Sequence, residues 1–115
     1  MVLEGKLPRE LKKGVIELGI LAVLARGRRY GWQIIKELDT LSNGFLKIKE
    51  GTLYPALHRM EARGLIKSEW VIEGGNVPRK YYHLTERGRE AYREGTMIWR
   101  RLEECMHRIM GDGDE

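Results

Sequence analysis

The stretch Glu50-Gly-Thr-Leu-Tyr-Pro-Ala-Leu-His-Arg-Met-Glu-Ala-Arg-Gly-Leu65 decides the fold of this chain. At about 100° per residue, Leu53, Leu57 and Met60 point in nearly one direction, so the stretch predicts a short helix with one apolar face. The opposite face is small near its start and basic further on; it comprises Gly51, Pro55, His58, Arg59 and Ala62. A helix whose N-terminal half lies deep in a DNA groove needs such a face.

The two ends of this predicted helix and the residues after it indicate a helix followed by a hairpin. Pro55 falls at or near the first turn, where its missing N–H costs little. Gly64 is expected to adopt the left-handed conformation that closes a helix. Alternating side chains then predict a strand over Ile66–Glu73 and a returning strand over Arg79–Leu84, with glycines at the hairpin tip between them.

Two further helices are predicted before this stretch, from about Glu10 to Ala25 and from about Tyr30 to Leu41. The second half of the first helix is apolar on nearly every side, which indicates that a partner subunit covers part of it. Gly31 is expected to let the second helix start close to a flat neighbour. Phe45–Lys49 alternates apolar and basic residues, so we expect a short strand or an extended connector there.

The last predicted helix, about Glu86–Met110, is the longest element, roughly 38 Å, and Thr85 is expected to cap its start. Apolar residues recur along it at alternating intervals of four and three, which is typical of a helix that pairs with another helix. We therefore expect a flexible leader at 1–9, a winged domain at 10–84, a dimerisation helix at 85–110 and a disordered tail at 111–115.

Composition sets the class of protein. The chain has 115 residues, enough for one domain, and its 42% hydrophobic and 33% charged residues exclude a disordered chain. The formal net charge of +4 is mild, so the position of the basic residues matters more than their number. One cysteine, Cys105, excludes an intramolecular disulfide. With no signal-like start and no apolar run long enough to span a bilayer, we expect a cytoplasmic protein.

The order helix, helix, helix, two-stranded hairpin is that of a winged helix-turn-helix, a mainly α fold with a small β-hairpin. On its motifs the chain resembles the PadR-like transcriptional regulators in their short form, over about residues 14–106. The residues that carry the resemblance are Leu18–Leu24, Tyr30-Gly-Trp-Gln-Ile-Ile35, Glu50–Leu57, Arg59-Met-Glu61, Gly64-Leu-Ile66, Gly74-Gly75, Pro78-Arg-Lys-Tyr-Tyr82, Leu84-Thr85 and Gly88. The family's hairpin often reads Gly-Gly-Arg-Pro-Arg-Lys, whereas Asn76-Val77 precede the proline here.

The resemblance implies a homodimer joined through the last helix, with each winged domain bound to half of a palindromic operator in double-stranded DNA. It also implies repression that a small molecule relieves. The predicted dimerisation residues are Ala91, Gly95, Ile98, Leu102, Cys105 and Ile109 on the last helix, with Val15 and Leu18 on the first.

The residues predicted to bind DNA lie on the second and third helices and the wing: Tyr30, Thr52, Tyr54, His58, Arg59, Asn76, Arg79 and Lys80. The hydroxyls of Thr52 and Tyr54 would bond phosphate oxygens; alternatively Thr52 caps the helix and Tyr54 packs on the wing. Arg59 would bind a phosphate or a guanine edge, or form a solvated surface pair with His58.

In the wing, Arg79 and Lys80 are the candidates for phosphate binding, with an ion pair to Glu69 or Glu73 as the alternative. Asn76 would either probe the minor groove or serve the tight turn. The hydroxyl of Tyr30 would bond a phosphate.

Trp99 is the candidate effector site, with Ile98 and Leu102 beside it. Two symmetric indoles would stack on a planar aromatic compound, as the family resemblance implies. The alternative is that Trp99 packs against the partner's first helix. Trp32 and Trp70 are expected in the core or in an interface.

The sequence predicts no enzyme, cofactor or metal site. Cys105 and the three histidines have no metal-ligand spacing, and no catalytic constellation or phosphate-binding glycine loop is present. Two rival functions remain open: a winged domain that binds other proteins, and a DNA-binding regulator without an effector.

Overall fold

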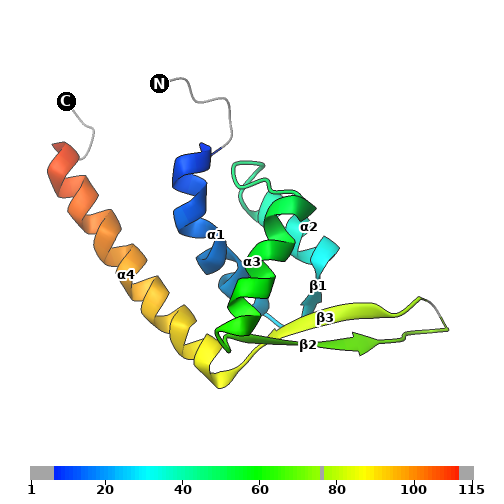
Figure 1. Ribbon diagram of the computed structural model, residues 1–115. Helices are drawn as coiled ribbons and strands as arrows, with labels where there is room; N and C mark the ends of the chain where they lie inside the picture. Colours follow the sequence, from blue (N-terminus) through cyan, green and yellow to red (C-terminus); the bar gives the residue numbers. More distant parts are fainter. Residues whose placement is uncertain (1–6, 76, 112–115) are drawn as a thin grey trace.

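The computed structural model describes residues 7–75 and 77–111 as four helices and a small sheet (Figure 1). In chain order the elements are α1 (Arg9–Leu24), β1 (Arg29–Tyr30), α2 (Gly31–Leu41), α3 (Glu50–Ala62), β2 (Ile66–Val71), β3 (Arg79–Leu84) and α4 (Glu86–Met110).

One apolar core holds the first three helices and the sheet together. The apolar side chains of α3 that share a direction in the sequence, among them Leu53 and Met60, are fully buried. They meet Ile20 of α1, Ile34 of α2 and Ile66 of β2, which are also fully buried. The exposed face of α3 is therefore fixed by the burial of its opposite face.

The sheet is antiparallel, in the order β1-β3-β2. β2 and β3 pair along their whole length, from Ile66 opposite Leu84 to Val71 opposite Arg79. The sequence predicted this hairpin but not β1, whose two residues pair with Tyr81 and Tyr82. A strand of two residues has no alternation to detect, because only its tertiary contacts with β3 define it.

The predicted element bounds hold to within two residues. α4 has the predicted bounds, α1 starts and ends one residue earlier, and Tyr30 is the N-cap of α2 rather than its first residue. β2 ends at Val71 instead of Glu73. The segment 45–49 is a connector without a strand, and Lys49 caps α3.

The predicted leader and tail lie mostly outside the described residues. Within the described part, Leu7 donates its backbone N–H to the carbonyl of Phe45 at 2.8 Å, so the end of the predicted leader is bonded to the fold. Gly111 adopts a left-handed conformation (φ 76°) that ends α4.

One expectation about α3 was wrong and another is confirmed. Pro55 is the sixth residue of α3, not part of its first turn, so the carbonyl of Gly51 lacks the N–H that would normally bond it. Beyond its own turn of the helix, a Cβ at Gly51 would meet nothing within 4 Å. Gly64 has the predicted left-handed conformation, with φ 78°.

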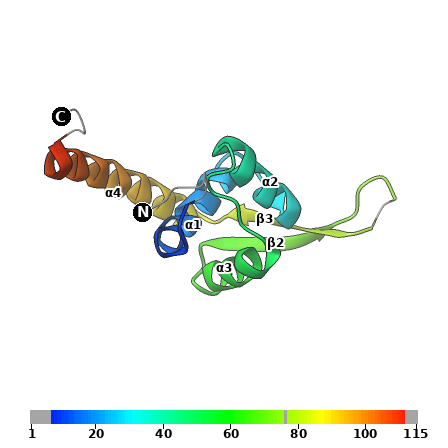
Figure 2. The same cartoon turned by 90° about the horizontal axis from the view of Figure 1, so that it is seen from above.

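The helix α4 leaves the body of the molecule and extends away from the wing (Figures 1 and 2). Its N-cap is Thr85, as predicted, whose side chain accepts from the backbone N–H of Gly88 at 3.0 Å. Ala91 and Tyr92 pack against the core, and Gly95 lies against Leu18 of α1. None of the helices in the described ranges is long and apolar enough to cross a membrane.

Candidate nucleic-acid interface

The exposed side of α3 forms an arc between the wing and α1. Tyr54 lies at the edge next to the wing, and Arg59 lies at the other edge, where it lines a shallow hollow together with Glu17 of α1. His58 is exposed and falls between them on the helix. Thr52 is exposed near Arg59 and does not cap the helix, so that alternative is wrong.

A hollow of about 290 Å³ separates the N-terminal half of α3 from the base of the wing. It brings together α3, the start of α2 and the two wing strands, all of which the sequence predicted. The lining residues are Tyr30, Gly31, Tyr54, Trp70, Arg79, Lys80 and Tyr82.

The two cations of this hollow rest on aromatic rings. The guanidinium of Arg79 lies 4.8 Å from the centre of the Tyr30 ring. The ammonium of Lys80 lies 5.9 Å from the ring centres of both Trp70 and Tyr82. Such contacts fix where a cation points without neutralising its charge.

The alternative that Arg79 and Lys80 are neutralised by wing carboxylates is wrong. Glu69 pairs with Arg28 at 3.5 Å, and Glu73 accepts a hydrogen bond from the hydroxyl of Tyr81 at 2.9 Å. Within the described ranges, neither wing cation forms an ion pair. Their positive charge therefore remains available to an anion.

Tyr81 and Tyr82, the two tyrosines of β3, are both buried and so brace the wing. The hydrogen bond to Glu73 raises the pKa of Tyr81, with burial adding to the effect. Burial raises the pKa of Tyr82, with smaller contributions from Tyr54 and Glu61. Both hydroxyls therefore stay neutral at physiological pH.

Tyr54 takes its place in the hollow because residue 31 is glycine. A Cβ atom at Gly31 would lie 2.1 Å from the Tyr54 hydroxyl oxygen and 2.7 Å from ring carbon Cζ. The flat neighbour expected beside Gly31 is thus the phenol of Tyr54. Tyr54 thus lies toward the wing, as the alternative expected, and its side chain is 43% exposed and lines the hollow.

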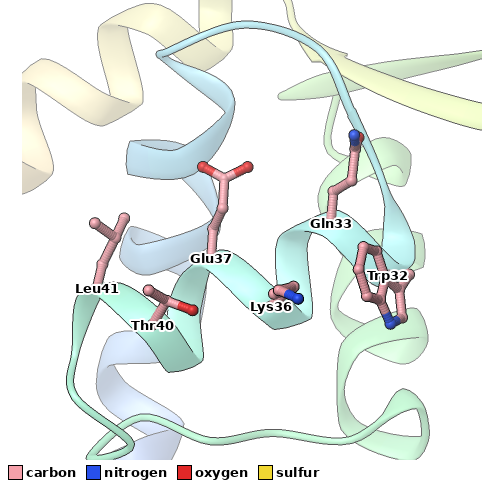
Figure 3. Close-up of a pocket in the computed structure, with 6 residues that line it drawn as sticks. All are labelled: Trp32, Gln33, Lys36, Glu37, Thr40 and Leu41. Atoms are coloured by element: carbon pink, nitrogen blue, oxygen red, sulfur yellow. The ribbon is translucent and has the colours of Figure 1, made fainter.

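Tyr30 joins this hollow to a second one on the outer side of α2. Its ring stacks on Trp32 at 6.4 Å and meets Tyr81 edge-on at 5.3 Å. Trp32 and Leu41 lie at the two ends of a hollow of about 270 Å³ along α2, and the ammonium of Lys36 sits 4.9 Å from the Trp32 ring centre (Figure 3).

Trp70 and Trp32 were expected in the core or in an interface, and neither is part of the protomer core. Trp70 is 68% exposed and Trp32 is 57% exposed. The remaining alternative, an interface, stays a prediction. The exposure of Trp70 had no signal in the sequence, because an aromatic residue in an alternating strand is normally interpreted as buried. Asn76 lies outside the described residues.

The predicted dimerisation residues divide into two groups. Ala91, Gly95 and Leu18 make contacts within the protomer, and Val15 and Cys105 are half-buried. Ile98 and Ile109, by contrast, are 67% and 76% exposed, and Leu102 lies between them on the same side of α4 and is also exposed. Trp99, the predicted effector residue, is 41% exposed one residue after Ile98.

Across the described part of the chain, no three His, Cys, Asp or Glu side chains gather in a way that could hold a metal ion.

The three helices, the hairpin and the exposed recognition face define a winged helix-turn-helix. Comparison with known proteins identifies which kind. The chain matches the model of the transcriptional regulator PadR-like family over residues 20–94, and it belongs to that family. Since the family consists of transcriptional regulators, the expectation that this chain is a regulator and not an enzyme is confirmed.

Curated and solved relatives agree with this assignment. A transcriptional regulator of Mycobacterium tuberculosis is 36% identical over 103 residues, covering 90% of each chain. The crystal structure of a PadR-like transcriptional regulator from Bacillus cereus has 30% identity and a TM-score of 0.78, covering 88% of this chain and 96% of that one. Bacillus subtilis PadR in complex with operator DNA has 26% identity and a TM-score of 0.65, over 71% of this chain and 46% of that one.

Proposed function

We propose that this regulator binds operator DNA as a homodimer and represses transcription until a small aromatic or hydrophobic effector releases it. The observation that carries the DNA-binding part is the hollow between α3 and the wing, which is lined by Tyr54 and by two cations that lack carboxylate partners in the described ranges. A surface with exposed donors and unneutralised positive charge beside a recognition helix suits the phosphate backbone of DNA.

Each predicted contact has a role in this proposal. Arg79 and Lys80 bind phosphates at the base of the wing, and Tyr30, Tyr54 and Thr52 offer hydroxyls to the backbone. His58 and Arg59 lie in the part of the arc that reads base edges in the major groove. Asn76 completes the wing contact.

The comparison with Bacillus subtilis PadR supports repression and operator binding for this chain. That relative is named a negative transcriptional regulator, and its structure was solved with operator DNA. Binding to an operator would place the present protein in the cytoplasm with the chromosome.

Dimerisation is supported by the second half of α4, where Ile98, Leu102 and Ile109 form an exposed apolar seam. A long helix with such a seam is stabilised when a second copy of the helix covers it. Two joined protomers then address two half-sites, with Val15 and Leu18 of α1 at the margin of the pairing.

The effector would act at the same place. Trp99 lies beside the apolar seam, with Ile98 and Leu102 as neighbours, so two indoles from paired helices would flank a planar compound. Its binding would change the angle between the winged domains, which then no longer fit successive major grooves.

The DNA-binding part is tested by selecting bound sequences from random duplexes and measuring the affinity for the selected operator against salt. We expect a site with two-fold symmetry and half-sites about one helical turn, or a multiple, apart. Arg79→Ala should weaken binding and make the log–log salt slope shallower by about 0.9 for each phosphate that the variant no longer neutralises. Arg100→Ala is the matched control, because that exposed arginine lies on α4, away from the wing.

Two results would contradict the DNA-binding part. The first is a salt slope near zero for the selected operator. The second is operator affinity that Arg59→Ala and Arg79→Ala both leave unchanged, which would instead favour a protein-binding winged domain.

The effector is tested by titrating a library of planar aromatic compounds while the emission of Trp99 is followed, with Trp99→Ala as the control. We expect a subset of compounds to quench emission in the parent and to lower operator affinity. Quenching by no compound in the library would favour a regulator that works without an effector.

A further inference from the structure

Trp70 is a large wing side chain whose exposure folding alone does not explain. It is 68% exposed, although burying an indole would favour folding strongly. It lies on the side of β2 that faces α3: Ser68, two residues earlier, donates a hydrogen bond to Glu61 of α3 at 2.9 Å. Since strand side chains alternate, Trp70 shares that side.

The neighbours of Trp70 give the surface around it a positive charge. Lys80 is its partner on β3, and its ammonium lies 5.9 Å from the Trp70 ring centre. Arg79 and Tyr54 line the same hollow of about 290 Å³. The indole is therefore one wall of this hollow. Lys80 shares its side of the wing, whereas the guanidinium of Arg79 rests on Tyr30 on the other side of β3, and neither cation has a carboxylate partner in the described ranges.

An apolar wall beside two unneutralised cations matches one repeating unit of the DNA backbone. The phosphate needs the cations, and the deoxyribose next to it offers an apolar face of its own. The hollow is also continuous with the exposed arc of α3, since Tyr54 belongs to both. An uncharged protein surface or a neutral planar ligand would leave the two charges unpaired.

We propose that Trp70 is a DNA-contacting residue: its indole packs on a deoxyribose of the operator while Lys80, on the same side of the wing, binds the adjacent phosphate and Arg79 binds a neighbouring one. This inference rests on the proposed operator binding and adds a contact to it. It predicts an apolar contribution to affinity at the wing base that does not depend on salt, because an indole carries no charge.

The test compares Trp70→Ala, Trp70→Phe and Met97→Ala in the 115-residue chain with the selected operator over a range of salt. Trp70→Ala should lose about tenfold in affinity at every salt concentration, with the parental slope. Trp70→Phe keeps a ring and should recover most of that loss. Met97→Ala is the matched control: Met97 is 68% exposed, like Trp70, but lies on α4 outside the hollow.

Fluorescence gives a second readout. In a chain with Trp32→Phe and Trp99→Phe, Trp70 is the remaining tryptophan, and saturating operator should quench its emission. Thermal unfolding of each variant checks that the fold is intact.

Two results would overturn the inference alone: operator binding by Trp70→Ala within about twofold of the parent at all salt concentrations, or Trp70 emission that saturating operator leaves unchanged. Failure of the parent chain to bind any selected duplex would overturn the proposed function and this inference together.

Discussion

At the scale of single residues, the wing cations are positioned by aromatic rings rather than by carboxylates. An ion pair would fix a cation equally well, but a DNA phosphate would then have to displace the carboxylate. A cation loses little free energy when it leaves a ring face for a phosphate, since an exposed cation–π contact contributes about 0.5–1 kcal/mol. Arg79 over Tyr30 is therefore oriented and still available to an anion.

Gly31→Ala tests whether the missing side chain at residue 31 positions Tyr54. The new Cβ would lie 2.1 Å from the phenol oxygen, so Tyr54 must leave the hollow. We expect a loss of operator affinity and a destabilisation of about 1–2 kcal/mol by chemical denaturation. In a Tyr54→Ala background the same substitution should cost much less; equal costs in both backgrounds would show that the two residues are not coupled.

The hydrogen bond between Tyr81 and Glu73 gives the wing a pH dependence on the alkaline side. Because the pKa of Tyr81 is raised above its ordinary value of 10.0, the folded state holds this proton more tightly than the unfolded state. The resulting stabilisation is complete below pH 10 and is lost as the pH rises through the folded pKa. We expect the free energy of unfolding to fall more steeply above about pH 10 in the parent than in Tyr81→Phe, measured by denaturant titration at each pH. Identical profiles would contradict this.

At the scale of elements, α4 is fastened directly to the end of α3. The backbone N–H of Thr85 donates to the carbonyl of Leu65 at 3.1 Å, and its hydroxyl donates to the carbonyl of Gly64 at 2.7 Å. Gly88 lies so close that a Cβ there would be 2.0 Å from the carbonyl oxygen of Leu65. A rotation of α4 would therefore be transmitted to the end of α3 through main-chain contacts.

Replacing Gly88 by alanine tests this junction, and the same substitution at two other helical glycines provides the comparison. Gly88→Ala meets a backbone atom, which cannot move aside as a side chain can, so we expect a loss of about 2–4 kcal/mol in unfolding free energy and weaker operator binding. Gly95→Ala meets only the side chain of Leu18, with Cδ1 at 2.8 Å, and should cost less. Gly14→Ala has open space and should stabilise α1 by up to about 1 kcal/mol. The reverse order of the three effects would refute the close approach at Gly88.

The elements were predictable to the extent that the signal was local. The apolar repeat that runs the length of α4, together with its cap residue Thr85, predicted the bounds of that helix. The glycines at 64 and 74–75 predicted the turns. β1 escaped prediction because pairing with β3 alone defines it. The exposure of Trp70 escaped as well, since alternation indicates which side of a strand a residue occupies but not whether that side is covered.

The candidate interface shows the same division between local and tertiary information. The sequence identified Tyr54, Arg79 and Lys80 as DNA-binding candidates, which the structure places around one hollow. It did not indicate that Arg79 rests on the ring of Tyr30 or that Lys80 rests on the ring of Trp70. The members of each pair are far apart in the sequence, and only the folded structure brings them together.

At the scale of the whole molecule, the protomer is elongated, with extents of 59 × 31 × 21 Å. The length comes from α4 at one end and the wing at the other (Figure 2). The wing end carries Arg79 and Lys80 beside the exposed Trp70, and the α4 end carries the exposed apolar seam of Ile98, Leu102 and Ile109. A dimer formed through the α4 ends would leave both wing ends free.

Leu102→Glu tests that arrangement. An unpaired carboxylate buried between two helices costs about 3 kcal/mol or more, so the dimer should dissociate while each protomer stays folded, because Leu102 is exposed in the protomer. Sedimentation should give a monomer at concentrations where the parent is a dimer. Arg100→Glu, placed about 160° from residue 102 around α4, is the charged control and should remain dimeric.

The monomeric variant also separates the contribution of each winged domain to operator binding. Since a single domain contacts the phosphates of one half-site, the log–log salt slope of Leu102→Glu should be about half that of the parent on the same operator. Its affinity for an isolated half-site should equal that of the parent, because the wing and α3 are unchanged. A variant that stays dimeric, or a monomer that keeps the full parental slope, would show that the apolar seam of α4 does not join the two DNA-binding domains.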